Sequence, residues 1–389
     1  MKIVVLGGAG AMGQVTVRDL TESAVIDEVI ICDFNQEKAE ELKNKLAHQK
    51  LIVAFVDICD KAKLVKALQG ATVVINSTLY YFNLQVMEAA LEAGCHYLDL
   101  GGLFHVTRDQ LAMDEDFKKK GLLAILGMGA APGMTNIMAA SAATELDTVD
   151  SIDIAIGCAD FAKVEHPLYP PYALDTILDE YTKEPMVFEN GKFKAKPPMS
   201  GEITIDFPDP IGQSKAILTL HSEVATLPLT YKKKGVSNVT FRLGLPTNFH
   251  EKLKFLVNLG FGSSQALNLQ EGPAVPRKVL AKLLEKFPAP DGDPDDCEIV
   301  RVDVKGSKGD TKTLVRLETT VFAHKEWKLS CGALDTGVPP SIVAQMIAQG
   351  QIPERGVLAP EACVPPEPFF AELAKRTIVM RRIPQIALV

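Results

Sequence analysis

Short apolar runs alternate with amphipathic segments along the first part of the chain. Continuous apolar runs bounded by turn residues are typical of buried strands, and apolar positions that recur every three to four residues are typical of helices. The predicted strands span residues 2–6, 29–32, 51–56, 73–76, 96–100 and 122–126, and the predicted helices span residues 15–20, 37–46, 61–68 and 84–93. This alternation predicts an α/β Rossmann domain, doubly wound, with a parallel sheet covered on both faces.

The pattern changes near residue 150, where period-two alternation replaces the continuous apolar runs. Residues 151–157 alternate as a half-exposed strand does, and residues 160–235 are rich in Pro, Gly and aromatic residues, with little helical periodicity. Residues 298–305 and 311–323 also alternate, and the five residues 306–310 between them predict a hairpin turn. We therefore expect an inserted α+β domain of mostly antiparallel or mixed sheet.

Helical periodicity returns at Pro339 and Pro340, which can start a helix, and Gly350 is expected to end it. Such a helix can pack back on the first domain. The predicted domains are residues 1–135 with 335–389, which bind the cofactor, and residues 136–334, which form the substrate and dimerisation domain.

A glycine motif follows the first predicted strand. The G-x-G-x-x-G pattern consists of Gly8, Ala9, Gly10, Ala11, Met12 and Gly13. In the dinucleotide-binding fingerprint the first glycine permits a tight turn, the second admits the pyrophosphate, and the third lets the helix pack close to the strand. Free N–H groups at the helix N-terminus then face the phosphates. In this strand–turn–helix setting, the motif predicts a dinucleotide site.

The acid that completes this fingerprint also indicates which dinucleotide binds. Asp33 closes the next apolar run, where a carboxylate can accept hydrogen bonds from the ribose hydroxyls. It would repel a 2′-phosphate, and residues 32–36 contain no arginine to bind one. We therefore expect NAD in preference to NADP. Asp57, at the end of the third strand, is expected to face the adenine end of the cofactor.

Polar residues and glycines also follow the later strands of the first domain. Ligands of doubly wound sheets bind beyond the carboxyl ends of the strands, so these residues are site candidates. Helix capping or packing would explain any one of them taken singly. Ser77, Thr78 and Pro132 are expected near the cofactor, and the residues expected near the substrate or its reacting atoms are Tyr80, Tyr81, Asn83, Asp99, Gly102 and Asn136.

Three residues of the second domain carry suitable chemistry. His221 and Glu223 follow the strand-like run 216–220 and would share one face of a strand, where a histidine and a carboxylate can act as base and orienting group. A surface strand would look the same in the sequence. Arg242 could clamp a substrate carboxylate with two hydrogen bonds, or it could be an exposed strand residue.

Composition excludes several classes of protein. The 389-residue chain has a formal net charge of −8 and only short basic runs, so we expect no binding to nucleic acid or membranes. Neither a signal-peptide pattern nor a membrane-spanning run is evident. The seven cysteines are scattered and never spaced C-x-x-C, which predicts reduced thiols in the cytoplasm and no metal site. The acidic segment 287–296 departs from the EF-hand pattern and is expected to be a loop.

Several segments together resemble the saccharopine dehydrogenase-like family. They are residues 4–10, 74–78, 97–102, 129–136, 336–350 and 356–361. The resemblance runs nearly end to end, and it is strongest to the lysine 6-dehydrogenases, notably in residues 81–83 and 99–102. It implies a Rossmann domain closed by C-terminal helices and an inserted sheet domain used in dimer contacts, so a homodimer is expected. Fungal saccharopine reductases have Asp-Thr-Ser-Tyr in place of residues 99–102, which argues against saccharopine as the substrate.

The resemblance also implies hydride transfer at a C–N bond of a lysine-type amino acid. It places Asp99 near this small-molecule substrate and Pro132 near the nicotinamide. The main hypothesis is an NAD-dependent dehydrogenase that oxidises the ε-amine of L-lysine to the semialdehyde, with Asp99, His221, Glu223 and Tyr81 as candidate catalytic residues. One alternative is saccharopine or carboxynorspermidine chemistry, which would need additional arginines around a second carboxylate. Another is a redox sensor that binds NAD without turnover.

Overall fold

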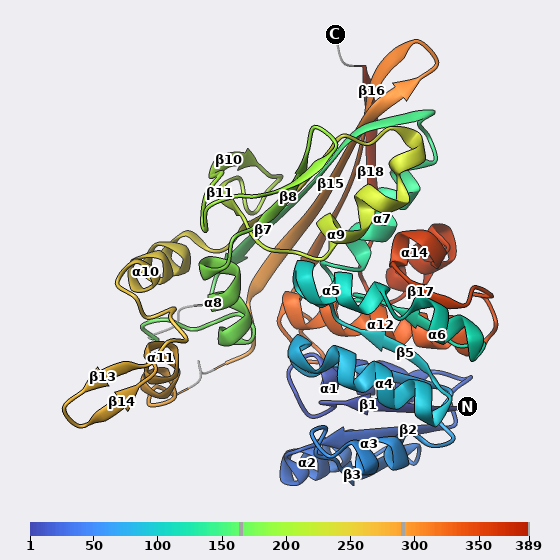
Figure 1. The fold of residues 1–389 in the computed structure, drawn as a ribbon, viewed down its shortest axis with the longest axis vertical. Helices are drawn as coiled ribbons and strands as arrows, with labels where there is room; N and C mark the ends of the chain where they lie inside the picture. Colours follow the sequence, from blue (N-terminus) through green and yellow to red (C-terminus); the bar gives the residue numbers. More distant parts are fainter. Residues whose placement is uncertain (163–165, 289–291, 388–389) are drawn as a thin grey trace.

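The computed structural model describes residues 1–162, 166–288 and 292–387, which form two large β-sheets with helices packed on and between them (Figure 1). The first sheet and its helices occupy the lower part of this view. The long strands of the second sheet rise away from them toward the C-terminus. No helix in these ranges is long and apolar enough to cross a membrane.

The first sheet is parallel and has the strand order of a doubly wound domain, β17-β6-β5-β4-β1-β2-β3. Its strands are β1 (Lys2–Leu6), β2 (Glu28–Asp33), β3 (Leu51–Phe55), β4 (Val73–Asn76), β5 (His96–Asp99), β6 (Leu123–Ile125) and β17 (Gly356–Leu358). Every strand predicted here from an apolar run is present, and β17 adds an edge strand from far along the chain. The predicted Rossmann fold is confirmed.

Helices cover both faces of this sheet because alternate strand residues belong to two different apolar cores. On β1, Ile3 and Val5 belong to one core and Val4 and Leu6 to the other. The first core includes residues of α1 (Gly13–Glu22), α2 (Gln36–Leu46) and α12 (Cys331–Ala348), and the second includes residues of α3 (Lys61–Leu68), α4 (Asn83–Ala93) and α6 (Asp114–Lys119). This arrangement explains why the strands are apolar throughout.

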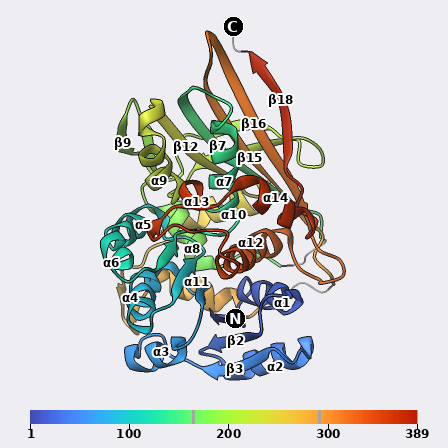
Figure 2. The same ribbon diagram turned by 90° about the vertical axis from the view of Figure 1, so that its right-hand side faces the viewer.

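The second sheet is mixed, as predicted, with the main strand order β10-β11-β12-β7-β15-β16-β18. Its strands are β7 (Thr148–Asp160), β8 (Met186–Glu189), β9 (Lys192–Ala195), β10 (Ile203–Asp206), β11 (Gln213–Leu218), β12 (Asn238–Gly244), β15 (Asp296–Lys308), β16 (Thr311–Phe322) and β18 (Arg381–Ala387). The β7–β12 pair is parallel, and β15 pairs antiparallel with both β7 and β16. The end of the chain therefore joins the second sheet as β18, beside β16 (Figure 2).

The β15–β16 hairpin turns more tightly than the sequence pattern predicts. Lys308 pairs with Thr311, so only Gly309 and Asp310 connect the strands, in place of the expected five residues 306–310. Gly309 has φ +57°, the left-handed conformation that two-residue hairpin turns require. The strand ladder thus continues through Gly306 and Ser307, which the sequence suggested as turn residues.

Several helices depart from the predictions. The stretch expected to have little helix contains α8 (Leu174–Thr182) and α9 (Glu223–Thr230), and two more helices follow, α10 (Thr247–Asn258) and α11 (Pro276–Leu284). Helix α12 begins at Cys331, capped by Ser330, and not at Pro339. Pro339 and Pro340 lie inside it, and their lack of an N–H leaves the carbonyls four residues earlier without helical partners.

One buried helix lies between the two sheets. All ten residues of α7 (Met134–Ala143) are buried, which explains its uncharged, alanine-rich sequence. It contacts β15 and β16 of the second sheet and also α13 (Pro360–Cys363) and α14 (Pro366–Ala374) of the C-terminal segment. The C-terminal segment thus packs against both parts of the molecule.

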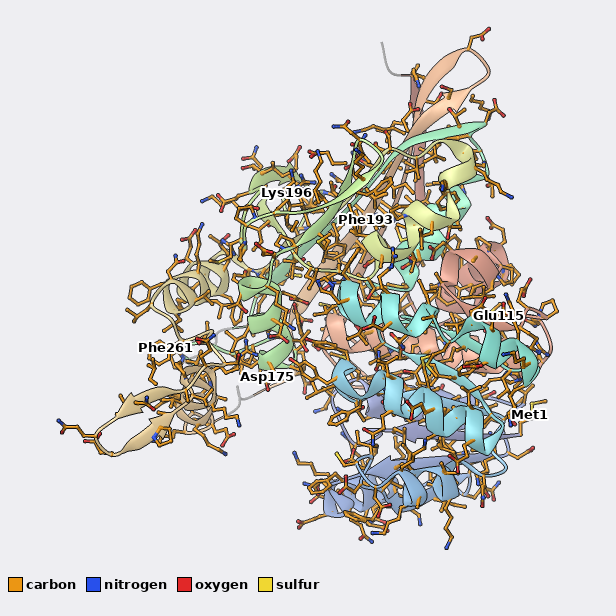
Figure 3. The ribbon with its side chains drawn as sticks, in the orientation of Figure 1. Met1, Glu115, Asp175, Phe193, Lys196 and Phe261 are labelled. Atoms are coloured by element: carbon orange, nitrogen blue, oxygen red, sulfur yellow. The ribbon has the colours of Figure 1, made fainter. Side chains whose placement is uncertain are left out.

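An arm made of α10, β13 (Leu267–Leu269), β14 (Gly272–Ala274) and α11 projects from the second domain (Figure 1). Phe261, after α10, and Asp175, in α8, mark the region where the arm joins (Figure 3). Arg277 of α11 ties this join together, because its guanidinium lies 2.9 Å from Asp179 and 4.0 Å from Asp175.

The packing of α12 on α1 yields a stability prediction. A Cβ at Gly337 would lie 2.6 Å from Val15 Cβ and 2.7 Å from the Met12 carbonyl oxygen. We expect Gly337→Ala to destabilise the protein by about 1–3 kcal/mol through this overpacking. In the same helix nothing lies within 4 Å of a Cβ at Gly332. The matched control Gly332→Ala should therefore be neutral, or stabilising by up to about 1 kcal/mol. Urea denaturation measures both, and equal effects would contradict the assigned contact.

Candidate active site

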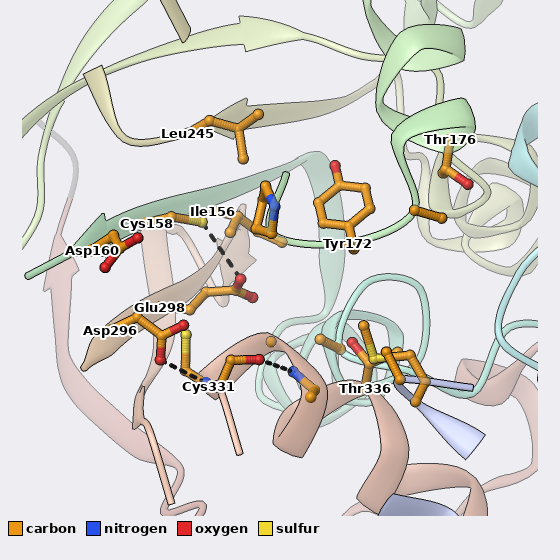
Figure 4. A pocket seen from close by; sticks show the side chains of 18 of the residues that line it. Ile156, Cys158, Asp160, Tyr172, Thr176, Leu245, Asp296, Glu298, Cys331 and Thr336 are labelled. Atoms are coloured by element: carbon orange, nitrogen blue, oxygen red, sulfur yellow. Dashed lines mark hydrogen bonds between the residues drawn. The ribbon is translucent and has the colours of Figure 1, made fainter. Parts of the chain in front are cut away.

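A cavity of about 1040 Å³ opens between the two sheets and is lined by residues of both. From the first domain it is lined by Gly7, Gly10, Ala11, Met12, Ser77, Thr78, Tyr80 and Pro132. From the second domain and α12 come Ile156, Cys158, Tyr172, Glu180, His221, Phe241, Glu298, Cys331 and Thr336, several of which are shown in Figure 4. Strand-end loops from one side and a sheet face from the other thus enclose one space.

The glycine loop has the close contacts that its motif requires. A Cβ at Gly13 would lie 2.2 Å from the Gly7 carbonyl oxygen, and one at Gly8 would lie 3.0 Å from Ile31 Cγ2, so turn, helix and β2 pack tightly together. Gly10 faces the cavity. Asp33 holds the loop in place, because its carboxylate accepts hydrogen bonds from the N–H groups of Ala9 (3.0 Å) and Asn35 (2.9 Å).

These residues fit a nicotinamide dinucleotide. Ser77 lines the cavity at the end of β4, and its buried Oγ has no hydrogen-bond partner among the described residues. Such an orphaned polar atom is ready to bond a ligand. Thr78 and Pro132 also line the cavity, at strand ends where the nicotinamide end of the cofactor is expected. Asp57 does not line the cavity, and its carboxylate accepts a hydrogen bond from the N–H of Cys59.

His221 and Glu223 are close together, but not on a strand as the sequence suggested. Strand β11 ends at Leu218, His221 lies in the following loop, and Glu223 begins α9. His221 Nδ1 lies 2.7 Å from Glu223 Oε2, and its ring stacks on Phe241 with centroids 3.6 Å apart. Since a carboxylate only accepts, Nδ1 carries the hydrogen and Nε2 remains for proton transfer.

The environment of His221 adjusts its proton affinity. Burial lowers its pKa, but the charge and hydrogen bond of Glu223 and the charge of Glu180 outweigh this and leave the pKa raised. Thr135 Oγ1 donates to Glu223 Oε1 at 2.8 Å, which fixes the carboxylate in place. A buried histidine held by an oriented carboxylate at a cavity wall is suited to general acid–base work.

Sequence reasoning missed two residues beside His221. Glu180 Oε1 lies 3.9 Å from His221 Nε2, and Tyr172 donates a hydrogen bond to Glu180. Burial raises the pKa of Glu180 to about 7. Both residues lie in the stretch whose helical periodicity is weak, so their positions could not be assigned. The only available signal was an acid beside the apolar positions Ile177, Leu178 and Tyr181 of α8.

Asp99 lies beneath the cavity and does not line it. It is completely buried and accepts hydrogen bonds from Tyr97 OH, Gln110 Nε2 and the N–H groups of Gly101 and Gly127. Burial raises its pKa, against these hydrogen bonds, which lower it. The carboxylate thus holds two strand-end loops together, which is a positioning arrangement.

The other predicted polar residues form supports around the cavity. Asn83 bridges Asn76, Asp99 and the Gly101 carbonyl, and the N–H of Gly102 donates to Ser222 Oγ at 3.2 Å. Asn136 bonds the Gly133 N–H and Glu361, behind the cavity wall.

Tyr80 and Tyr81 connect the first domain to α8. Both hydroxyls donate to the buried carboxylate of Asp179, and Lys183 Nζ donates to Tyr80 OH at 2.6 Å. Only Tyr80 lines the cavity. Tyr80 therefore forms part of the cavity wall, and both tyrosines anchor the second domain on the first.

Arg242 lies on the opposite face of its strand from the cavity. Its neighbours on β12, Phe241 and Leu243, line the cavity, and successive strand residues point to opposite faces. Its Nη1 donates to Thr240 Oγ1 at 2.9 Å. The interpretation of Arg242 as a carboxylate clamp in this cavity is therefore wrong. No arginine occurs among the described residues that line the cavity.

The fold and this cavity define an NAD(P)-dependent oxidoreductase. Residues 3–125 match the family model of the saccharopine dehydrogenase NADP-binding domain, and residues 129–378 match the saccharopine dehydrogenase C-terminal domain. The chain belongs to the saccharopine dehydrogenase family. The resemblance inferred from the sequence is thus confirmed.

Curated relatives match along nearly the whole chain. A carboxyaminopropylagmatine dehydrogenase of Synechocystis is 25% identical over 393 residues, with 96% of each chain covered. A carboxynorspermidine synthase of Vibrio cholerae is 26% identical over 392 residues, covering 93% of this chain and 92% of the relative.

Solved structures share the fold. Saccharopine dehydrogenase (L-Glu forming) of Saccharomyces cerevisiae aligns over 100% of both chains with a TM-score of 0.77 and 16% identity. Homospermidine synthase of Legionella pneumophila, solved in complex with NAD, aligns over 98% of this chain and 91% of its own, with a TM-score of 0.69 and 12% identity.

The His221–Glu223 contact yields a testable pKa change. We expect Glu223→Gln to lower the pKa of His221, because the charge and the charged acceptor that raise it are removed while burial, which lowers it, remains. The neutral, proton-accepting form would then persist to lower pH. An NMR titration of the ring measures this. Glu361→Gln, a buried carboxyl away from His221, is the control, and an unchanged pKa in Glu223→Gln would contradict the pairing.

Proposed function

We propose that this enzyme forms or breaks the secondary-amine C–N bond of a carboxylated polyamine-type compound, with NAD(P) as the redox partner. The observation that carries this proposal is the cavity itself, where a dinucleotide loop and a buried histidine with two carboxylates face one another. The curated relatives support it, because their names specify carboxynorspermidine and carboxyaminopropylagmatine. Lysine ε-deamination, the main hypothesis from the sequence, has less support.

The reaction class requires proton transfers that the second-domain residues can supply. In the synthetic direction a neutral amine attacks an aldehyde carbon, water leaves, and the resulting imine is reduced to a secondary amine. A bound nicotinamide supplies or accepts the hydride. His221 Nε2 can take the proton from the incoming ammonium and return it to the departing hydroxyl, while Glu223 stabilises the protonated ring. Glu180, with a pKa of about 7, can exchange that proton with His221.

A carboxylate on the substrate needs a positive partner, which the sequence suggested would be arginine. Two lysines that line the cavity are the candidates for this role instead. Lys252 lines the cavity from α10, and Lys328 lines it near the start of α12, where it is paired with Asp293. Of the two, Lys252 is the better candidate for the carboxylate, because no ion pair involving it occurs among the described residues.

A substrate panel tests this proposal. We expect NADH or NADPH oxidation, followed at 340 nm, when the protein receives an amino-bearing aldehyde acid together with 1,3-diaminopropane or agmatine. With NAD(P) and L-lysine alone, we expect much weaker reduction of the cofactor. His221→Gln should lower kcat by about 10²–10⁴-fold, the usual range for loss of a general acid–base group. Faster turnover of lysine than of the amine–aldehyde pair would favour the deamination hypothesis instead.

Asp33 makes NAD the proposed cofactor, although the matched family model is of the NADP-binding type. We expect kcat/KM to be higher with NADH than with NADPH, because a carboxylate at the end of the second strand would repel a 2′-phosphate. Asp33→Ser should reduce the ratio of kcat/KM for NADH to kcat/KM for NADPH by about tenfold or more, because the loss of one hydrogen bond to a charged group has an effect of about that size. Asp57→Ser is the matched control at the next strand end. A wild-type preference for NADPH would refute the assignment.

A further inference from the structure

The cavity wall formed by β15 carries an acid, Glu298, with a second acid, Asp335, buried behind it. Glu298, near the start of β15, lines the cavity and accepts a weak hydrogen bond from Cys158 Sγ at 3.5 Å (Figure 4). Asp335, in α12, is completely buried and does not itself line the cavity; burial, and then the charge of the neighbouring Glu298, raise its pKa. Asp335 Oδ2 has no hydrogen-bond partner among the described residues, and Oδ1 accepts one long bond from Thr336 Oγ1 at 3.5 Å. The pair is therefore poorly satisfied.

Two other buried acids, for example, have cationic partners, whereas the buried Asp99 and Glu361 accept several hydrogen bonds from neutral donors. Glu318 pairs with Arg301, and Asp19 pairs with Arg376 at 2.6 Å. Neither Glu298 nor Asp335 is in an ion pair among the described residues, and the nearest acid along β15, Asp296, adds further negative charge. Burial raises the pKa of Glu298 to about 7 and that of Asp335 well above its usual value. Unpaired buried carboxylates are costly, and a cationic ligand would remove that cost.

The position of the pair places such a ligand in the reaction cavity. Glu298 lies directly opposite Cys158 in the β7–β15 ladder, on the same face as the cavity-lining Ile156. Thr336, next to Asp335, lies close to Gly129 of the strand-end loop that holds Pro132. No group of three or more His, Cys, Asp or Glu residues that could hold a metal ion occurs in the described residues. The expected cation is therefore organic.

We propose that Glu298, supported by the buried Asp335 behind it, forms a subsite for the second, non-reacting cationic nitrogen of the amine substrate, an ammonium or a guanidinium. This inference rests on the proposed function, since it assigns one end of that substrate. A cationic nitrogen offers several N–H donors to acceptors that lack them. A carboxylate would be repelled from this wall, so the acid end of the product must lie elsewhere. The subsite thus selects diamines over monoamines.

The test compares amines with and without a second charge. With saturating NADH and aldehyde, we expect wild type to prefer 1,3-diaminopropane or agmatine over propylamine in kcat/KM. Glu298→Gln should raise KM for the dication by roughly tenfold or more, with kcat less affected and propylamine kinetics unchanged. Asp335→Asn serves as the second variant if Glu298→Gln does not fold. Glu361→Gln is the matched control, because this buried carboxyl lies outside the cavity.

Calorimetric binding separates this inference from the proposed function. We expect 1,3-diaminopropane or agmatine to bind the NADH-loaded wild type more tightly than propylamine, and Glu298→Gln to abolish that difference. Whichever of 1,3-diaminopropane and agmatine binds more tightly shows whether the subsite prefers an ammonium or a guanidinium. If no amine turns over but the Glu298-dependent binding persists, the proposed reaction is wrong and the subsite stands. If the dication and the monoamine bind the wild type with equal affinity, or if Glu298→Gln changes both affinities equally, the subsite is refuted.

Discussion

The structure depends on a buried polar seam in which two successive residues, Ser222 and Glu223, join the two domains. Ser222 Oγ donates to the Leu103 carbonyl and accepts from the N–H of Gly102 and from Thr107. Glu223, its neighbour, is bonded by Thr135 at the start of α7. Because these groups are buried, separating the domains would leave several polar atoms unsatisfied. The seam therefore fixes His221, which precedes Ser222, at one position relative to the glycine loop.

What the sequence could predict was local. The glycine motif, Asp33 and the apolar strands each specify structure within a few tens of residues, so the Rossmann sheet and the glycine turn after β1 were predicted correctly. The pairing of His221 with Glu223 was also anticipated, although the reason given was wrong, because the chain turns from β11 into α9 between them. Because His221 and Glu223 are only two residues apart in the sequence, they lie close together even though the predicted strand is a loop followed by a helix.

The remainder of the site depends on register and on long-range packing. Arg242 was a sound candidate by residue type, yet the face it occupies is set by pairing with β7, which no local pattern specifies. Glu298 did leave a signal, because the alternation of β15 puts it on the same face as Val300 and Val302. An acid among apolar residues on one face of a strand is a candidate for a functional site. Asp335 could be recognised only after α12 was known to begin before Pro339.

The two domains contribute different kinds of chemical group to the cavity, and this sets the distribution of charge in it. The first domain supplies backbone N–H groups and small residues, which suit the phosphates of a dinucleotide. The second domain supplies acids, and two of them, Glu180 and Glu298, have pKa values raised to about 7 by burial. In the proposed reaction an amine arrives protonated and reacts neutral, so carboxyls in the cavity would attract it and His221 would then remove its proton. In this proposal, different acids serve the two purposes: Glu298 recognises the amine, whereas Glu223 and Glu180 set the proton affinity of His221.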